Sequence, residues 1–343
     1  MAKLNDIRAL AESHAAEISR STKTWTGYLD TAATLYRYDF PETLLIHAQR
    51  PEATACAELE IWNSRMGRWV NRGSKGIALI DDSGPRRRLR YVFDISDTHM
   101  VRGGKTPYIW QMEPQIRQEM AGYLMDTYGL EYDPDAPLAS VLMALARAQV
   151  NDSLEDAMDG LAYEVRGTYL EGLGEDAVRE NFRRLMENST YYMLARRCGL
   201  DPWVEVTPDD FSGIANFNRL SVLSFLGNAA HDIVEPILKD IGREVILRYR
   251  ILAAEKEIDR YIERAGYTQE EIEKAQKELA EKDESGYNKF NTLIRESVDG
   301  DQAQDNEEGR ETGENTEGGR KDGSDIHEER RLPVPEPDCE LPA

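Results

Sequence analysis

Residues 67–94 read GRWVNRGSKGIALIDDSGPRRRLRYVFD, and this stretch decides the fold class. Arg68–Val70 is short and extended, residues 71–76 have the composition of a turn, and Ile77–Ile80 is an apolar run typical of a buried strand. A second turn separates that run from Leu89–Asp94, where polar and apolar residues alternate as they do in a half-buried strand. The stretch therefore predicts a small antiparallel sheet.

Helical patterns precede this sheet. Apolar residues recur at intervals of three and four from Leu4 to Ile18 and again from Trp25 to Tyr36. Pro41 suits the first turn of a short third helix, and Glu58–Met66 predicts a fourth. Together with the short strands, these helices predict an α+β domain over residues 1–115.

The rest of the chain up to about residue 290 is predicted to be helical. Thr268 and Glu271 match a capping box that opens a charged helix. Prolines 202, 208 and 236 predict turns or first-turn positions. The predicted helices cover Leu138–Val150, Leu154–Leu170, Ala177–Cys198 and Ser221–Tyr249.

The last segment has a different composition. Residues 291–343 are rich in Asp, Glu, Gly, Asn, Arg and Gln, and so few apolar groups cannot offset the entropy lost on ordering. They predict a disordered low-complexity tail or linker. The expected fold is therefore α+β, with a small N-terminal domain of helices and a short antiparallel sheet at 1–115, an acidic helical domain at 116–290, and the tail at 291–343.

Charge is unevenly distributed along the 343 residues. The chain has 42 Lys and Arg against 64 Asp and Glu, a net charge of −22. Residues 61–110, called here the basic island, hold 10 basic and 4 acidic side chains, a net charge of +6. The whole-chain charge argues against indiscriminate nucleic-acid binding, but a local patch acts over a Debye length of about 8 Å. The basic island is thus the place where phosphate binding is expected.

Cysteine usage and hydropathy predict a cytoplasmic protein. Cys56, Cys198 and Cys339 are far apart with no C-x-x-C spacing, which argues against a cysteine zinc site and a disulfide framework and fits a reducing compartment. The first residues lack the apolar core of a signal peptide, and no apolar run approaches 18 residues. No membrane partner is expected.

Enzyme signatures are missing from the sequence. There is no H-E-x-x-H, no G-x-G-x-x-G and no G-x-S-x-G, and Gly73–Gly76 lacks the earlier glycine of a phosphate-binding loop. We therefore expect no catalytic residue, no metal and no cofactor. One alternative remains, a metal-dependent hydrolase that uses His231 and nearby acids.

The basic island carries the candidate binding residues. Its cations would neutralise phosphates, while an exposed indole would stack on unpaired bases. Trp62 lies beside Leu59 and Ile61 in a helical pattern and is expected in the core, whereas Trp69 fits the core and the surface equally well. The predicted nucleic-acid-binding residues are Arg65, Arg68, Trp69, Arg72, Lys75, Arg86, Arg87, Arg88 and Arg90.

Three ordered blocks of the sequence resemble a known family. They are LLIHAQRPEATAC at 44–56, GRWV followed by RGSKGI within 67–77, and VFDISDT at 92–98, with Trp62 between the first two. They are similar to the ArdC-like single-stranded-DNA-binding domain that opens large helicase- and methylase-containing proteins of bacterial conjugative elements. The resemblance covers about residues 20–115 and continues more loosely to about 290.

The resemblance implies binding of single-stranded DNA by a non-enzymatic accessory protein of a mobile element, in antirestriction or conjugative DNA processing. Its expected partners are single-stranded DNA and a helicase or other mobile-element protein. ArdC proteins also carry a zinc metallopeptidase domain, but without H-E-x-x-H that activity is not expected here. The alternative function is an acidic DNA mimic: a net charge of −14 over residues 121–290 would let the helical region occupy a host nuclease or another protein as a decoy.

Overall fold

The computed structural model describes residues 3–265. Its first three elements are helices. They are α1 (Leu4–Ile18), α2 (Thr22–Thr34) and α3 (Phe40–Gln49). The hydroxyl of Ser21 accepts a hydrogen bond from the backbone N–H of Thr24, and the carboxylate of Asp39 accepts one from Glu42. These N-caps satisfy backbone donors that a helix start leaves open, and Pro41 lies in the first turn of α3 as predicted.

The strands form two small antiparallel sheets. The first has the order β1-β4-β3, and the second is a ribbon of two strands, β2 and β5. The sequence predicted β2, β3 and β4, but it missed β1 and β5, because three residues are too short to show a period. The strands are β1 (Cys56–Glu58), β2 (Arg68–Val70), β3 (Ile77–Asp81), β4 (Arg88–Asp94) and β5 (Thr98–Met100).

The helix predicted over Glu58–Met66 is shorter than expected. Glu58 belongs to β1, where it pairs with Val92 of β4, and a single π-helical turn, η1, spans Ile61–Arg65. Trp62 on this turn is fully buried, as predicted, and its indole N–H donates to the carbonyl oxygen of Phe93 at 2.8 Å. At the start of this segment, backbone pairing with β4 therefore outweighs the helical propensity of the residues.

Helices account for most of the remaining described chain. The α-helices are α4 (Arg117–Thr127), α5 (Leu138–Met158), α6 (Leu161–Glu164), α7 (Glu175–Arg197) and α8 (Leu220–Ala265). The 3₁₀ turns are η2 (Ile95–Asp97), η3 (Pro114–Ile116), η4 (Pro202–Val204) and η5 (Pro208–Asn216). The fold is therefore α+β, with a small antiparallel sheet near the N-terminus followed by helices.

Two helix predictions in this region were wrong. Leu154–Leu170 is not one helix: α5 ends at Met158, and Gly160 adopts a left-handed backbone with φ of +81° before the short α6. Pro236 lies inside α8 rather than at a turn. The long apolar face of α8 packs on both sides of Pro236, which offsets the lost backbone hydrogen bond. The predicted capping box at Thr268 and the predicted tail at 291–343 lie outside the described residues.

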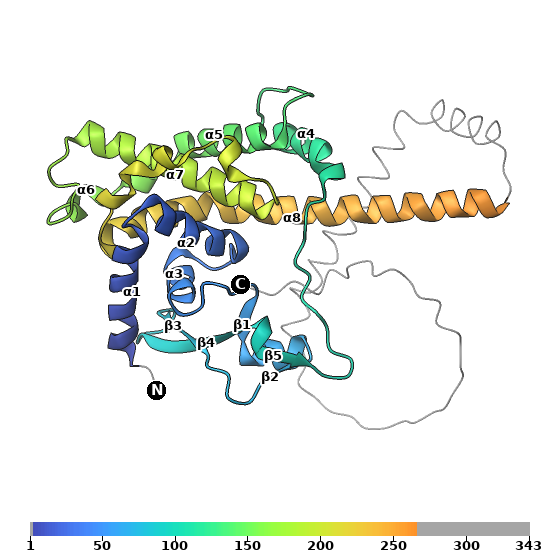
Figure 1. Ribbon diagram of the computed structural model, residues 1–343, viewed down its shortest axis with the longest axis horizontal. Helices are drawn as coiled ribbons and strands as arrows, with labels where there is room; N and C mark the ends of the chain where they lie inside the picture. Colours follow the sequence, from blue (N-terminus) through green and yellow to red (C-terminus); the bar gives the residue numbers. More distant parts are fainter. Residues whose placement is uncertain (1–2, 266–343) are drawn as a thin grey trace. The chain divides into compact units, whose positions relative to one another are not determined.

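The helices and the sheets share one packed unit. Residues 3–250 fall in a single compact unit, in which the indole N–H of Trp25 on α2 donates to the hydroxyl of Ser189 on α7 at 2.9 Å. Figure 1 shows α2 and α3 between the strands on one side and α4, α5 and α7 on the other, with α1 along the edge, reaching the level of the strands. The segments predicted as an N-terminal and a helical domain are thus in direct contact. Among the described residues, no helix is long and apolar enough to cross a membrane.

A glycine allows α8 to approach the N-terminal helices closely. A Cβ at Gly227 would lie 1.9 Å from Cδ2 of Phe40, whose ring is buried at the start of α3. The benzyl ring therefore occupies the space in which any other residue of α8 would place a side chain. This contact joins α3 to α8, the last described helix.

We expect Gly227→Ala to destabilise the protein although alanine is the better helix former. Overpacking against Phe40 costs about 1–3 kcal/mol, which exceeds the gain of about 1 kcal/mol in helix propensity. Urea unfolding followed by circular dichroism measures the difference. Gly122→Ala in α4 is the matched control, because nothing lies within 4 Å of a Cβ there, and it should be neutral or stabilising. Equal effects of the two substitutions would contradict the packing argument.

Two histidines join α1 to α3. Nε2 of His14 lies 2.8 Å from Nδ1 of His47, and the carboxylate of Glu17 lies 3.2 Å from Nδ1 of His14. Burial, together with the neighbouring His14, lowers the pKa of His47 to about 4, and Glu17 opposes that change only weakly. The ring of Tyr28 meets His47 edge-on. His47 is therefore neutral in the folded protein at neutral pH.

This pKa predicts a pH-dependent stability. Because the unfolded chain binds a proton at His47 near pH 6.5 and the folded chain does so only near pH 4, the stabilisation is complete above pH 6.5 and is lost as the pH falls towards 4. With allowance for partial solvent exposure, the loss amounts to about 2 kcal/mol. Unfolding free energies measured at several pH values should fall over this window, and the fall should be smaller in His47→Gln. An identical pH profile in both proteins would refute the assignment.

Candidate nucleic-acid interface

The carboxylate of Asp94 holds the chain in place where the two sheets meet. One oxygen accepts from the backbone N–H groups of Thr54 (2.7 Å) and Ala55 (3.0 Å), and the other accepts from the backbone N–H (2.9 Å) and hydroxyl (2.5 Å) of Ser96. Burial by itself would raise the pKa of this carboxyl, but these hydrogen bonds outweigh it and the pKa is lowered. Asp94 thus ties the end of β4 to the start of β1 and to η2.

Two residues at the end of α3, Gln49 and Arg50, also form bonds to this region. The amide side chain of Gln49 accepts from the backbone N–H of Ala78 and donates to its carbonyl oxygen, both at 2.9 Å, and so pairs with the edge of β3 as a strand would. Arg50 forms an ion pair with Asp97, whose backbone carbonyl accepts from the N–H of Asn71. These contacts set the position of the turn at 71–76 and of the β2–β5 ribbon.

The ribbon presents an aromatic face. Trp69 of β2 is directly opposite His99 of β5, so both side chains point to the same face of the ribbon. The indole is 57% exposed, and Nδ1 of His99 lies 2.7 Å from the side-chain oxygen of Asn71. Asn71 follows Trp69 by two residues and therefore lies on this face too. Trp69, left open between two alternatives by the sequence, lies at the surface.

The turn at 71–76 brings cations and a second aromatic ring next to this face. Gly73 has a φ of +94°, which the turn requires, and a Cβ at Gly76 would lie 3.1 Å from both Tyr91 and Phe93. The turn therefore packs directly against β4, with Tyr91 39% exposed beside it. Arg72 and Lys75 project from this turn and are exposed. Arg72 and Lys75 thus lie in the segment that runs from Trp69 of β2 to the contact of Gly76 with Tyr91 of β4.

The predicted cations fall into four groups. Arg65 on η1, like Arg72 and Lys75, is exposed and has no ion pair among the residues that the structure describes. Arg68 is half-buried and donates to the hydroxyl of Thr98 at 2.8 Å, so it supports the ribbon. Arg90 forms ion pairs with Glu42 and Glu58, so its charge is already balanced within the fold.

The remaining predicted arginines, Arg86, Arg87 and Arg88, lie elsewhere. They are at the far end of the β3–β4 hairpin, separated from the turn at 71–76 by the length of β3, about 14 Å at about 3.4 Å per residue. Arg88 forms an ion pair with Asp81 at 2.6 Å. The basic island of the sequence is thus two separate groups of cations in the fold.

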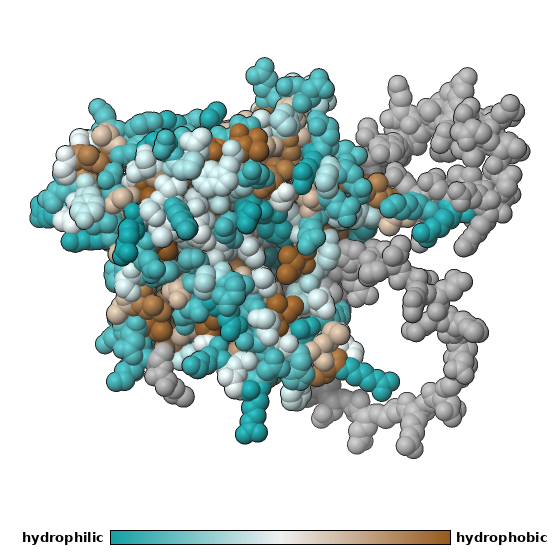
Figure 2. All heavy atoms as spheres, viewed as in Figure 1, coloured by the Kyte–Doolittle hydropathy of each residue, from teal (hydrophilic) through white to brown (hydrophobic). Residues whose placement is uncertain are grey.

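The sequence reasoning missed part of the face. His99 was not predicted because β5 is only three residues long, and its pairing with β2 shows only in the structure. Met100 on the same strand is 54% exposed, and Arg102 in the following turn is exposed. Figure 2 shows hydrophilic side chains projecting from the part of the molecule that contains the strands. The candidate interface consists of Trp69, Arg72, Lys75, Tyr91 and His99, with Arg65 and Arg102 nearby.

A metal site is not found in the described part of the chain. Within residues 3–265, no three or more His, Cys, Asp and Glu side chains gather in a way that could hold a metal ion. His231, proposed from the sequence as part of a metal site, is half-buried in α8, and burial lowers its pKa. No group of described ligands therefore supports the hydrolase alternative.

Comparison with known proteins adds no relative. No protein-family model matches the chain, and no curated protein and no solved structure is similar to it. The functional argument therefore rests on the residues of this chain and their geometry.

We expect Asp94→Asn to destabilise the region that holds the ribbon. The amide NH₂ would face the N–H and hydroxyl of Ser96, which leaves a buried donor without an acceptor at a cost of about 1–3 kcal/mol. Urea unfolding gives the loss in stability, and hydrogen exchange at Asn71 should become faster. The matched control is Asp82→Asn in the exposed β3–β4 turn, which should change neither quantity. Similar results for both variants would remove Asp94 from its central role.

Proposed function

We propose that the protein is a non-enzymatic accessory factor that binds single-stranded DNA on the face formed by Trp69, Arg72, Lys75, Tyr91 and His99. The observation that carries the proposal is the exposed indole of Trp69, held on a short ribbon next to cations that have no ion pair among the described residues. Cytoplasmic action on a mobile element, in antirestriction or conjugative DNA processing together with a helicase or similar protein, is the role that we propose for this binding.

The aromatic side chains support recognition of unpaired bases. Burying Trp62 and exposing Trp69, seven residues later, places one indole in the core and leaves the other in water. A large flat ring that is exposed to water loses the stabilisation that burial would give it. Stacking of a base on the ring would bury it again and contribute about 1–3 kcal/mol per base to binding. Because the bases of a duplex are already stacked on one another, this mode of binding favours single strands.

The cations support contact with the phosphate backbone. Arg72 and Lys75 lie in the turn that follows Trp69 and packs against Tyr91, and Gly73 and Gly76 in that turn carry no side chain that would hold a phosphate away. A chain with a net charge of −22 repels nucleic acid at long range, so binding depends on this local group of cations. The affinity should therefore fall steeply with salt.

The proposal predicts distinct effects of two kinds of substitution on full-length protein, measured by fluorescence anisotropy with labelled single-stranded oligonucleotides. Trp69→Ala should weaken binding about 5- to 150-fold, the equivalent of one lost stacking contact. Arg72→Gln with Lys75→Gln should weaken binding and lower the slope of log affinity against log salt by about 1.4, since each phosphate contact on a single strand contributes about 0.7. Double-stranded oligonucleotides should bind more weakly than single strands.

The matched control is Arg86→Gln with Arg87→Gln, which removes the same charge from the tip of the β3–β4 hairpin. It should leave the affinity within about twofold of the unmodified protein, because the tip is about 14 Å from the turn at 71–76. Equal losses for the two double variants would show that net charge alone drives binding and would overturn the site. No binding at low salt would overturn the function.

A further inference from the structure

The tip of the β3–β4 hairpin carries two arginines that the fold does not use. Residues 82–87, between the two strands, read DSGPRR, and Arg86 and Arg87 are exposed. Neither of them forms an ion pair with any residue in the described range 3–265. Arg88, the next residue, differs because it is paired with Asp81 across the strands. Two neighbouring guanidinium groups are thus available to a ligand.

The turn that carries these arginines is held at its base. One carboxylate oxygen of Asp81 accepts from the backbone N–H of Ser83 at 3.1 Å and from its hydroxyl at 2.6 Å, and the other accepts from Nε of Arg88 at 2.6 Å. The hydrogen bonds from Ser83 and then from Arg88 lower the pKa of Asp81 to about 2, so this carboxylate is ionised at neutral pH. Pro85 restricts the turn further, because its ring fixes φ. The two cations therefore project from a turn that is partly fixed before any ligand binds.

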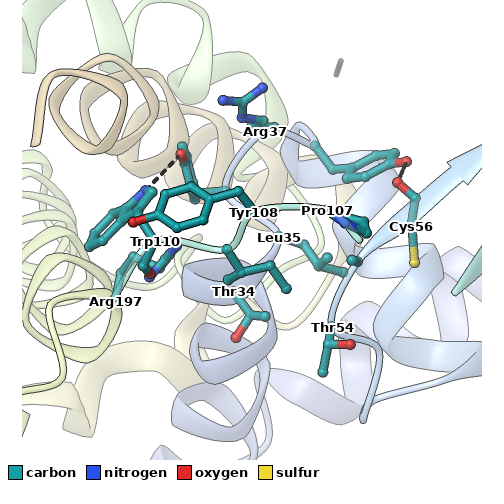
Figure 3. Close-up of a pocket in the computed structure, with 13 residues that line it drawn as sticks. Thr34, Leu35, Arg37, Thr54, Cys56, Pro107, Tyr108, Trp110 and Arg197 are labelled. Atoms are coloured by element: carbon teal, nitrogen blue, oxygen red, sulfur yellow. Dashed lines mark hydrogen bonds between the residues drawn. The ribbon is translucent and has the colours of Figure 1, made fainter. Parts of the chain in front are cut away.

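Arg197, by contrast, is used by the fold although it lies in a pocket. The walls of this pocket come from four stretches of chain: the α2–α3 connection, the start of β1, the extended segment 107–110, and the last turn of α7, which holds Arg197 (Figure 3). Its guanidinium carbon lies 3.5 Å from the centre of the Trp110 ring, and Nη1 donates to the carbonyl oxygen of Trp110 at 2.7 Å. Arg197 therefore stabilises the position of the segment 107–110. Arg86 and Arg87 have no such role within the described chain.

The composition of the tip favours double-stranded DNA over unpaired bases. Residues 81–88 include no aromatic side chain, so nothing there would stack on an exposed base. Arginines on a narrow projecting hairpin reach phosphates readily, and a guanidinium suits phosphate oxygens because it offers several donors in one plane. Along its axis, a duplex carries about twice as many phosphates as one of its strands. A small group of cations without a stacking ring is therefore better matched to a duplex.

The tip lies close enough to the Trp69 face for both to contact one DNA molecule. Tyr91, which the turn at 71–76 contacts, is paired with Ala78 near the start of β3. It is three residues along β4 from Arg88, a separation of about 10 Å at about 3.4 Å per residue. This length corresponds to about three base pairs, since successive nucleotides of a strand rise about 3.4 Å along the axis. A duplex that begins where the bound single strand ends would therefore lie next to the tip.

We propose that Arg86 and Arg87 bind the phosphates of a DNA duplex that adjoins the single strand held at the Trp69 face, so that the protein recognises junctions between single- and double-stranded DNA. The inference rests on the proposed function and adds the class of substrate. A chain with a net charge of −22 repels a free duplex, so two cations do not hold one by themselves. Once the adjoining single strand is bound, the duplex is held nearby at an effective concentration on the order of millimolar, and the weak contact at the tip adds to the affinity.

The test is fluorescence anisotropy of the full-length protein with a labelled oligothymidine, with the same oligothymidine extended by a duplex at its 5′ or its 3′ end, and with the duplex alone. We expect at least one of the two tailed duplexes to bind about tenfold more tightly than the oligothymidine. Its slope of log affinity against log salt should be steeper by about 1.8, because each duplex phosphate contributes about 0.9. In Arg86→Gln with Arg87→Gln, this gain should disappear, while the oligothymidine should bind as it does to the unmodified protein.

The matched control is Arg166→Gln with Arg219→Gln, which removes the same charge from exposed positions in the helical part of the chain and should leave the gain intact. Equal losses of the gain in the two double variants would exclude a specific role for the tip. The inference is overturned, and the proposed function stands, if the oligothymidine binds but neither tailed duplex binds more tightly, or if the gain survives in Arg86→Gln with Arg87→Gln. If the oligothymidine itself does not bind, the proposed function fails and this inference fails with it.

Discussion

One buried carboxylate, that of Asp94, controls the geometry on which the rest of the N-terminal part depends. It accepts five hydrogen bonds from three residues in two separate stretches of chain, and it does so at the point where β4 ends and the chain turns into η2 and β5. An ionised carboxylate is suited to this position because it has only acceptors and every neighbour is a donor. This arrangement sets the direction in which the chain leaves β4 and enters β5. It therefore also sets the position of the β2–β5 ribbon.

The sequence blocks 44–56, 67–77 and 92–98 bond to one another and to the sheet in the fold. Gln49, Arg50 and Thr54 come from the first block, and they bond to Ala78, Asp97 and Asp94 respectively. Arg68 of the second block donates to Thr98 of the third. Several residues of these blocks therefore hold α3, the sheet and the ribbon together. The residues that would touch DNA, Trp69, Arg72 and Lys75, are a small exposed subset.

Electrostatics separates the cations into those that stabilise the fold and those that are available to a ligand. Arg50 and Arg90 are balanced by carboxylates on neighbouring elements, at partly buried positions where an unpaired charge would be costly. Arg72 and Lys75 need no partner because water solvates them. Arg197 belongs to neither group: it is mostly withdrawn from water, and within residues 3–265 its guanidinium is stabilised by the rings of Trp110 and Tyr36 and by the carbonyl oxygen of Trp110.

The sequence by itself determined the α+β class, the positions of α1–α3 and the strands β3 and β4, because apolar periodicity, N-caps and prolines act over a few residues. It also placed Trp62 in the core. Only the tertiary structure decided that β1 and β5 exist, that Trp69 is exposed opposite His99, and that the basic island divides into two groups. Those features depend on pairing between segments distant along the chain, which no local pattern encodes. The pocket at Arg197 is the clearest case, because its walls come from four stretches that meet only in the folded protein.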